Sequence, residues 1–536
     1  MRKTAIILSC FLAFTAAAQP ATPDRWITQQ GPTPQARQMT RLLADAQQFG
    51  LSAADYQGAA LLAELARVSQ PGTTGTALAR FAQELDAQAQ HLVHDLHFGR
   101  IDPRAAGFAL PENRPPLDMP AILSQLSRAH DVQAALSTIE PPFYHYALLK
   151  AALRRYLQLS QDASLTRLPA MGVRSIKPGE SYAGAPSLRH LLFELGDLPD
   201  AGGTSNILDP PLVAALKRFQ GRHGLEPDGA LGARTFAALT TPLSMRVRQI
   251  DLTLERWRWL PMFTTPPIIV NIPQFRLFAF HTLSDRAATI MQMDVIVGKT
   301  YANTRTPVFV GDLRTVVFRP YWDVPRSIAV HEMLPQIRRD PKYLARNHLE
   351  LVDGPGDGSP VVAPSAQAID ALAAGRLRIR QQPGEDNALG LVKFLFPNSY
   401  NVYMHSTPAH QLFAQSRRAF SHGCIRVSDP VKLAQFVLRN TTPPWDEVRI
   451  RQAMQGADNQ RVALKDPVRV MILYATALAT EGGPILFFDD LYGLDRRLER
   501  LLDNAKQRAP GAAPMGYDPA HSVHPGLEQA DIAQAS

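Results

Sequence analysis

One cysteine of the chain lies in a sequence context that suits nucleophilic catalysis. Cys424 stands in AFSHGCIRVSD, residues 419–429, beside His422 and Gly423, and a second imidazole, His405, precedes it in NVYMHSTP. A thiolate attacks a carbonyl carbon well when a base close in space takes its proton. By composition alone, a lone cysteine is more often a small buried hydrophobic residue. The combination of SHGC with a strand-like run that ends in histidine favours catalysis.

Two histidines are candidates for the base. His405 ends an apolar, strand-like run and is therefore expected to be held rigidly, whereas His422 lies on a turn two residues from the sulfur. We expect His405 to be the base and His422 to shape the pocket, with His422 as the alternative because geometry must decide. The glycine allows a tight turn, so the backbone N–H groups of Gly423 and Cys424 are the expected oxyanion donors.

The sequence predicts that a β-rich domain over residues 263–450 positions these candidate residues. Alternating apolar residues predict strands at 268–280 and 288–297, a β pair over 308–325, and strands at 391–396 and 400–405. A mixed segment at 330–387 interrupts them and is expected to form a cap. After the cysteine, Asp429-Pro430 predicts the N-cap and first residue of a helix. Arg426 shares a face with Cys424 if the link between them is extended.

The remaining chain divides into helical and irregular parts, and the predicted fold class is multidomain α+β. Apolar residues at helical spacing precede the catalytic domain, and mixed structure follows it. The predicted divisions are a helical scaffold domain at 19–164, a linker at 165–187, a small three-helix module at 188–242, a connecting helix at 243–262, a C-terminal scaffold segment at 451–503 and a disordered tail at 504–536.

Residues 1–18 have the features of a secretory signal peptide, with Arg2 and Lys3 before an apolar run and a small-residue cleavage region. Removing them lowers the formal net charge from +8 to +6, because no acidic residue is lost. The basic residues are dispersed, which disfavours nucleic acid as a partner. No later stretch has the length and apolarity of a membrane span. We therefore expect an exported protein of the periplasm.

Two segments resemble known wall-associated families. LRHLLFELGDL followed by VAALKRFQGRHGLEPDGALGARTFAAL resembles the peptidoglycan-binding domain. HSTP at 405–408 and SHGCIRV at 421–427 resemble the catalytic domain of the L,D-transpeptidases, the YkuD-type fold. YWDVPRSIA, ARNHLELVD and NALGLVKFLFPNSYNVYMHSTP strengthen this second resemblance. The order of the segments is similar to that of the large periplasmic branch of the family.

The resemblance implies a role for each candidate residue. Cys424 would be the nucleophile, His405 the base and Ser406 the residue that orients the imidazole through its backbone. Arg426 would hold a substrate carboxylate in a two-pronged contact. His422, Ser421 and Tyr403 would line the substrate pocket. No metal or organic cofactor is implied.

The implied reaction joins two peptidoglycan stems. The thiolate attacks the carbonyl at the L-centre of diaminopimelate in a tetrapeptide stem, D-alanine leaves, and an amine of a neighbouring stem resolves the thioester into a 3→3 crosslink. The expected partners are tetrapeptide stems and glycan strands, with other wall-synthesis enzymes as further candidates. A thiolate set to attack such an amide is also expected to be acylated by carbapenems.

Other functions remain open at this point. Water as the acceptor would make the protein an L,D-carboxypeptidase, and a lipoprotein lysine would make it an anchoring enzyme. A non-catalytic protein could bind the wall through residues 188–242. A zinc hydrolase could use His405, His422 and Cys424, but Arg426 would repel the cation and no carboxylate stands near these ligands.

Overall fold

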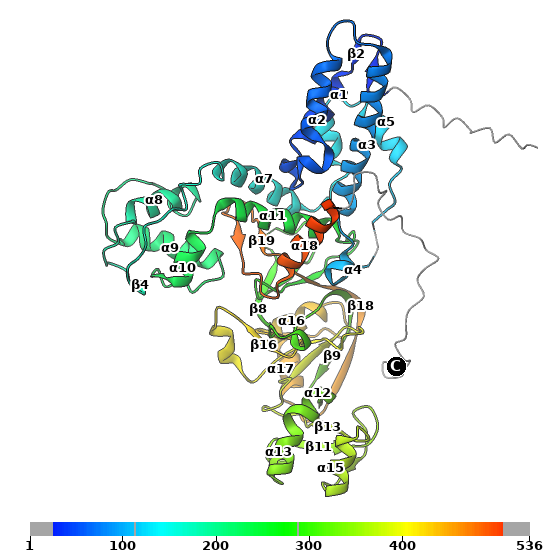
Figure 1. The fold of residues 1–536 in the computed structure, drawn as a ribbon. Coiled ribbons are helices and arrows are strands. Elements are labelled where there is room, and N and C mark those ends of the chain that lie inside the picture. Colours follow the sequence, from blue (N-terminus) through cyan, green and yellow to red (C-terminus); the bar gives the residue numbers. More distant parts are fainter. Residues whose placement is uncertain (1–24, 112–113, 287–288, 508–536) are drawn as a thin grey trace, which may run out of the picture. The chain divides into compact units, whose positions relative to one another are not determined.

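The computed structural model describes residues 25–111, 114–286 and 289–507 (Figure 1). The expected signal peptide and most of the expected tail lie outside the described residues. The described chain forms two compact units. The first comprises residues 25–47, 51–97 and 116–140, and the second comprises 48–50, 98–111, 114–115 and the chain from 141 onward.

The first unit is helical, as expected. Its longest helix buries Phe81, Leu85 and Leu92 along one face, at the spacing of an amphipathic helix. The indole N–H of Trp26 donates to a carboxylate oxygen of Asp86 at 2.9 Å, which satisfies a buried polar pair. The elements of this unit are β1 (Ile27–Thr28), β2 (Gly31–Pro32), α1 (Pro34–Ala44), η2 (Ala53–Tyr56), α2 (Gly58–Val68), α3 (Gly75–Phe98), α5 (Met119–Leu126) and α6 (Val132–Ser137).

The helix α7 (Tyr144–Leu159) lies in the predicted scaffold domain but belongs to the second unit. It packs against α11 (Leu243–Arg258), the helix expected between the module and the catalytic domain. The guanidinium of Arg258 is fully buried and donates to the carbonyl oxygen of Phe49 and to the Tyr146 hydroxyl. The expected boundary at residue 164 therefore differs from the structure, in which α7 packs beside α11.

The three short helices expected at 188–242 are present as α8 (Ala185–Glu194), α9 (Pro210–Arg222) and α10 (Ala233–Leu239). The segment expected to be a linker contributes to this module, because β4 (Ser175–Ile176) pairs with β5 (Leu231–Gly232). Inside the module, the buried guanidinium of Arg222 holds the carboxylate of Asp197, at 2.5 Å between Nη2 and Oδ2.

The catalytic domain is built on a ten-stranded sheet in the order β14-β15-β17-β8-β7-β6-β18-β9-β3, with β16 paired to β8. Because β14 also pairs with β9, the strands from β14 to β9 close into a ring. The strands are β3 (Phe108–Ala109), β6 (Ile268–Asn271), β7 (Arg276–Ala279), β8 (Met291–Gly298), β9 (Val308–Phe318), β14 (Val392–Leu395), β15 (Met404–His405), β16 (Ala419–Ser421), β17 (Ile425–Val427) and β18 (Gln460–Leu473).

Two of these strands differ from the sequence-based expectation. Residues 308–325 were expected to form a β pair, but β9 is one continuous strand. The strand β18 lies in the segment expected to be a C-terminal scaffold, yet it pairs with β6 on one side and β9 on the other. The catalytic sheet therefore extends beyond the expected limit at residue 450. This pairing joins segments far apart in the chain, which local sequence patterns do not report.

The expected cap is a small subdomain with its own four-stranded sheet, in the order β10-β13-β11-β12. It begins earlier than residue 330, because Trp322 and Asp323 pair with Gln381 and Arg380. Its helices cover a separate apolar cluster that includes Ile379 and Leu351. The cap elements are β10 (Trp322–Asp323), α12 (Arg326–Ile328), the π-helical turn η4 (Ala329–Met333), α13 (Leu334–Arg339), α14 (Tyr343–Arg346), β11 (Leu349–Val352), β12 (Val361–Val362), α15 (Ala366–Ala373) and β13 (Arg378–Gln381).

The predicted helix after the nucleophile is confirmed as α16 (Pro430–Val437), and the Asp429 side chain accepts from the backbone N–H of Lys432. The expected tail begins later than residue 504, because α18 (Leu494–Gln507) is helical up to Gln507. The remaining elements are η1 (Ala46–Phe49), α4 (Pro103–Ala106), η3 (Ala302–Thr304), η5 (His410–Ala414), α17 (Glu447–Gln455), β19 (Ala477–Leu478) and β20 (Leu486–Phe487).

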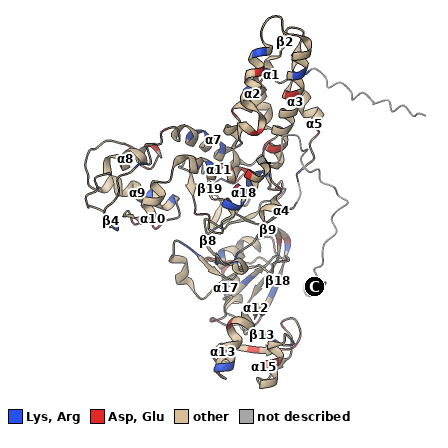
Figure 2. Cartoon of the chain, in the orientation of Figure 1, with Lys and Arg blue, Asp and Glu red and all other residues tan. Residues whose placement is uncertain are grey.

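Basic and acidic residues are distributed over the described helices and strands without gathering on one element (Figure 2). Within the described residues, no helix has the length and apolar character needed to cross a bilayer.

Candidate active site

The site is organised by the register of three neighbouring strands. His405 on β15 pairs with Lys393 on β14 and with Arg426 on β17. Residues that face each other in a register project from the same side of a sheet. The alternate row, Phe394, Met404 and Ile425, belongs to the hydrophobic core. One face of these strands is therefore apolar and buried, and the other carries Lys393, His405 and Arg426.

Cys424 joins this face because it precedes Arg426 by two residues. Tyr403 stands in the corresponding position before His405, and the backbone N–H of Ile425 donates to the Tyr403 carbonyl oxygen at 3.0 Å. The Cys424 sulfur donates to the carbonyl oxygen of Asn401 at 3.8 Å, and Tyr403 acts to lower the pKa of the thiol. Tyr403, a predicted substrate-binding residue, therefore lies near the thiol, and its own pKa responds to Cys424 and to Trp322 of the cap strand β10.

His405 is buried and its tautomer is set by the backbone. Its Nδ1 atom lies 2.5 Å from the carbonyl oxygen of Ser406. Because a carbonyl can only accept, Nδ1 carries the proton and Nε2 keeps its lone pair. Burial, the positive charge of Arg426 and that of Lys393 lower the pKa of His405 to about 3, against the backbone bonds that raise it. The imidazole is therefore neutral at ordinary pH.

The cysteine is a neutral thiol in the resting site. Burial raises the pKa of Cys424, while Tyr403 and the charges of Arg426 and Lys393 lower it by smaller amounts. Since His405 is also neutral, the pair does not rest as a thiolate and an imidazolium. His405 and Cys424 come from neighbouring segments of the sheet, because Arg426, two residues after Cys424, pairs with His405.

The Ser421 side chain stabilises the loop that carries Cys424 through two hydrogen bonds inside the loop. This residue is buried, and its hydroxyl donates to the Cys424 carbonyl oxygen at 2.6 Å and accepts from the Gly423 N–H at 3.1 Å. Ser421 was expected to line the substrate pocket, but its hydroxyl is engaged inside the loop. The Gly423 N–H, an expected oxyanion donor, is likewise engaged. The Cys424 N–H has no hydrogen-bond acceptor among the described residues, so it is the unengaged one of the two expected donors.

Gly423 has a φ of +120°, a conformation that a side chain would strain. Its carbonyl oxygen accepts from the Thr306 hydroxyl at 2.8 Å, and the same hydroxyl oxygen accepts from the Gly298 N–H. The Tyr492 hydroxyl donates to the Gly298 carbonyl oxygen at 2.7 Å. These bonds fix the nucleophile loop against β8 and the C-terminal segment. Sequence reasoning missed Thr306 and Tyr492, because neither is near the motifs in the chain.

His422 points to the cap and not to the sulfur. Its Nε2 lies 2.9 Å from a carboxylate oxygen of Glu332 in η4, and both side chains are largely solvent-accessible. The structure therefore places His422 at the junction of the nucleophile loop and the cap.

Sequence reasoning also missed Lys393. It lies in the quoted stretch NALGLVKFLFPN, and its ammonium stands 5.9 Å from the centre of the Tyr403 ring. A lone lysine inside an otherwise apolar strand is a signal that could have identified it. Among the described residues there is no group of three or more His, Cys, Asp or Glu side chains placed to hold a metal ion.

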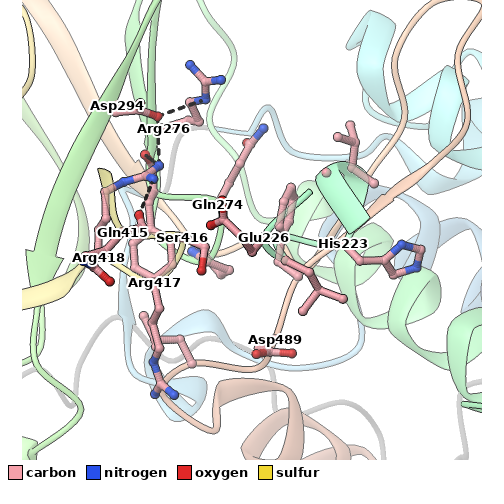
Figure 3. A pocket seen from close by; sticks show the side chains of 18 of the residues that line it. His223, Glu226, Gln274, Arg276, Asp294, Gln415, Ser416, Arg417, Arg418 and Asp489 are labelled. Atoms are coloured by element: carbon pink, nitrogen blue, oxygen red, sulfur yellow. Dashed lines mark hydrogen bonds and ion pairs between the residues drawn. The ribbon is translucent and has the colours of Figure 1, made fainter. Parts of the chain in front are cut away.

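A separate cavity of about 380 Å³ lies between the three-helix module and the catalytic sheet (Figure 3). Its walls come from the loop after α9, the turn between β6 and β7, and the segment before β16, where Arg418 bonds to Asp294 at 2.8 Å. Cys424 and His405 do not line it. The cavity is therefore distinct from the site that holds the thiol.

Comparison with protein families agrees with this architecture. Residues 266–463 match the family model of the L,D-transpeptidase catalytic domain (YkuD). Residues 24–153 match a scaffold domain, and residues 186–239 match a domain described as "Putative peptidoglycan binding domain".

A relative from Haemophilus influenzae, described as "Putative L,D-transpeptidase", is 31% identical over 262 residues, which is 48% of this chain and 50% of the relative. The match thus spans about half the length of each protein. Three segments of the chain thus match a YkuD-type L,D-transpeptidase catalytic domain, a scaffold domain and a putative peptidoglycan-binding domain.

Proposed function

We propose that the protein forms 3→3 crosslinks between peptidoglycan stems through a cysteinyl thioester, with release of D-alanine. The observation that carries the proposal is the strand register that pairs His405 with Arg426 on one face of the sheet. Arg426 follows Cys424 by two residues. This arrangement offers a nucleophile, a base and a cation for a carboxylate-bearing substrate. The match to the L,D-transpeptidase domain supports the substrate class.

The first step forms the thioester. His405 takes the Cys424 proton on Nε2 as the sulfur attacks the carbonyl carbon at the L-centre of diaminopimelate. The negative charge that develops on the carbonyl oxygen is met by the Cys424 N–H. When the C–N bond breaks, the imidazolium returns its proton to the amine of D-alanine, which leaves. Ser406 keeps the ring in the productive tautomer throughout, through the carbonyl oxygen that accepts from Nδ1.

The second step releases the product. The side-chain amine of diaminopimelate in an acceptor stem attacks the thioester carbon, and His405 removes a proton from that amine. Collapse of the intermediate breaks the C–S bond, and the thiolate regains the proton from the imidazolium. The net result exchanges one amide bond for another, so no external energy source is required.

We place this reaction outside the cytoplasmic membrane, in the periplasm, where the substrate polymer lies. The match of residues 186–239 to a domain described as "Putative peptidoglycan binding domain" supports this placement. We further propose that the module brings glycan strands to the catalytic domain.

The test is incubation of purified protein with disaccharide-tetrapeptides, followed by separation and mass analysis of the products. The expected result is a 3→3 linked dimer and free D-alanine, both absent with Cys424→Ala. A tripeptide product without dimer would instead assign water as the acceptor and an L,D-carboxypeptidase activity. Crosslinking by the Cys424→Ala variant would overturn the proposed nucleophile.

A further inference from the structure

Two cations flank the proposed base. Lys393 lies opposite His405 on one side and Arg426 lies opposite it on the other, on strands that both pair with β15. Neighbouring strands are about 4.8 Å apart, so the backbones of the two basic residues are separated by roughly 10 Å. The three side chains form a row with the imidazole in the middle.

Neither cation has an acidic partner of its own among the described residues. The Nε atom of Arg426 is buried and has no hydrogen-bond partner there. Asp357 of the cap raises the pKa of Lys393 by its charge, but its carboxylate forms an ion pair with Arg461 at 3.7 Å. Burial lowers the pKa of both Lys393 and Arg426. A buried cation without a partner is costly, and binding of an anion relieves that cost.

We propose that Lys393 and Arg426 form a double carboxylate receptor that holds two separate carboxylates of the donor stem on either side of His405. This inference rests on the proposed function. Arg426, two residues from the nucleophile, takes the carboxylate of the leaving D-alanine. Lys393, on the far side of the imidazole, takes a second stem carboxylate. Two anchors on opposite sides of the base would align the scissile carbonyl with the sulfur.

Carboxylate binding also affects the base. Arg426 and Lys393 both lower the pKa of His405, so neutralising their charges raises the basicity of its Nε2 atom. The donor stem would therefore improve the base as it binds, whereas an uncharged amide would leave it weak. This gives selectivity for anionic stems in the chemical step as well as in binding.

The test measures each enzyme variant on each of three donor stems that differ in which carboxylates are free. The rate of acyl-enzyme formation, as kcat/KM, is measured for the free tetrapeptide stem, for a stem ending in D-alaninamide, and for a stem amidated at its remaining carboxylates. Lys393→Met is expected to lower kcat/KM about 10- to 100-fold on the free stem and on the D-alaninamide stem, because charge-assisted hydrogen bonds are lost. No such loss is expected on the stem amidated elsewhere, because there Lys393 has no carboxylate to bind and its charge only weakens His405. Arg426→Met should show the reverse dependence.

Two control variants distinguish loss of carboxylate binding from a general effect of removing a charge or disturbing the fold. Lys465→Met removes the same charge from an exposed position of β18 and should match the wild type. Lys393→Arg keeps the charge and should recover most of the rate, which also rules out a folding defect. Equal losses for Lys393→Met on all three stems would overturn the receptor, because the loss would then not depend on a stem carboxylate. Absence of any acyl-enzyme with the wild type would instead contradict the proposed function.

Discussion

The Nδ1 atom of His405 lies 2.5 Å from the carbonyl oxygen of Ser406, and this single contact decides which nitrogen of the ring can act as a base. The carbonyl holds the proton on Nδ1, so the lone pair is on Nε2. The other histidine near the thiol, His422, is bonded to Glu332 of the cap. The two imidazoles therefore have different surroundings: His405 is buried on β15, and His422 lies between the cysteine loop and the cap.

Substitution of each histidine should distinguish their roles. His405→Gln should slow acylation of Cys424 by about 10²- to 10⁴-fold, because proton transfer from the thiol loses its acceptor. His422→Gln should cost less than about 10-fold, because an exposed ion pair contributes at most about 1 kcal/mol. Acylation rates followed by intact-mass analysis provide the measurement. A greater loss for His422→Gln than for His405→Gln would contradict the assignment.

The pH dependence of Cys424 alkylation should show that Cys424 and His405 are both neutral in the resting site. Burial raises the pKa of the Cys424 thiol, and the pKa of His405 is about 3, so no imidazolium stabilises a thiolate near neutrality. The rate with iodoacetamide should rise continuously from about pH 6 to beyond pH 9, the range in which thiols ordinarily ionise. A plateau of high reactivity near pH 6 would indicate a thiolate–imidazolium pair and disprove this description.

Tyr403→Phe should slow alkylation at about pH 8 several-fold, because the thiolate loses one charge-assisted hydrogen bond. The charges of Arg426 and Lys393 would still favour the thiolate, so reactivity is not abolished. Tyr301→Phe is the matched control, since this tyrosine is 73% exposed and its hydroxyl contacts no sulfur. Similar rates for both variants and the wild type would show that the Tyr403 hydroxyl does not stabilise the thiolate.

Carbapenems should acylate the protein at Cys424. Attack of the sulfur on the β-lactam carbonyl opens the strained ring, and the product is a thioester that keeps the whole drug. Intact-mass measurement should show one added drug per chain for the wild type and none for Cys424→Ser in the same time. Peptide mapping of the adduct should identify the segment around 419–429. A wild-type protein without adduct after prolonged exposure would refute the expectation.

Asp251 on α11 predicts a pH-dependent stability outside the active site. Burial raises its pKa to about 7, against the charges of Arg248, Arg100 and Arg258, and its Oδ1 atom is buried without a hydrogen-bond partner in the described residues. In the unfolded chain it should titrate near pH 3.9. The folded state therefore binds this proton more tightly, and stability present in acid is lost as the pH rises from about 4 to about 7.

Asp251→Asn should remove that loss. Relative to the wild type, its free energy of unfolding should increase between about pH 4 and pH 7, by at most a few kcal/mol, and stay level above that range. Calorimetric Tm values at about pH 5 and pH 8 provide the measurement. Asp458→Asn, at an exposed position, should show no such difference. A wild type and Asp251→Asn variant with parallel pH profiles would contradict the shifted pKa.

Much of the fold followed from local patterns. The three short helices of the module, the strands β6, β14 and β15, and the capped helix α16 lie where periodicity and capping residues predicted them. The domain boundaries were less accurate. The helix α7 packs in the second unit, the cap begins at Trp322, and β18 belongs to the catalytic sheet. In each case the deciding contact joins residues distant in sequence.

The sequence by itself determined the local chemistry, because the nucleophile and its glycine are contiguous and His405 closes a strand of alternating character. Only the tertiary structure decided which groups meet on the face of the sheet. Strand register places Lys393 and Arg426 on either side of His405, and the fold of the cap brings Glu332 to His422. Register depends on pairing between separate segments, and a shift by one residue would turn each of these side chains to the opposite face.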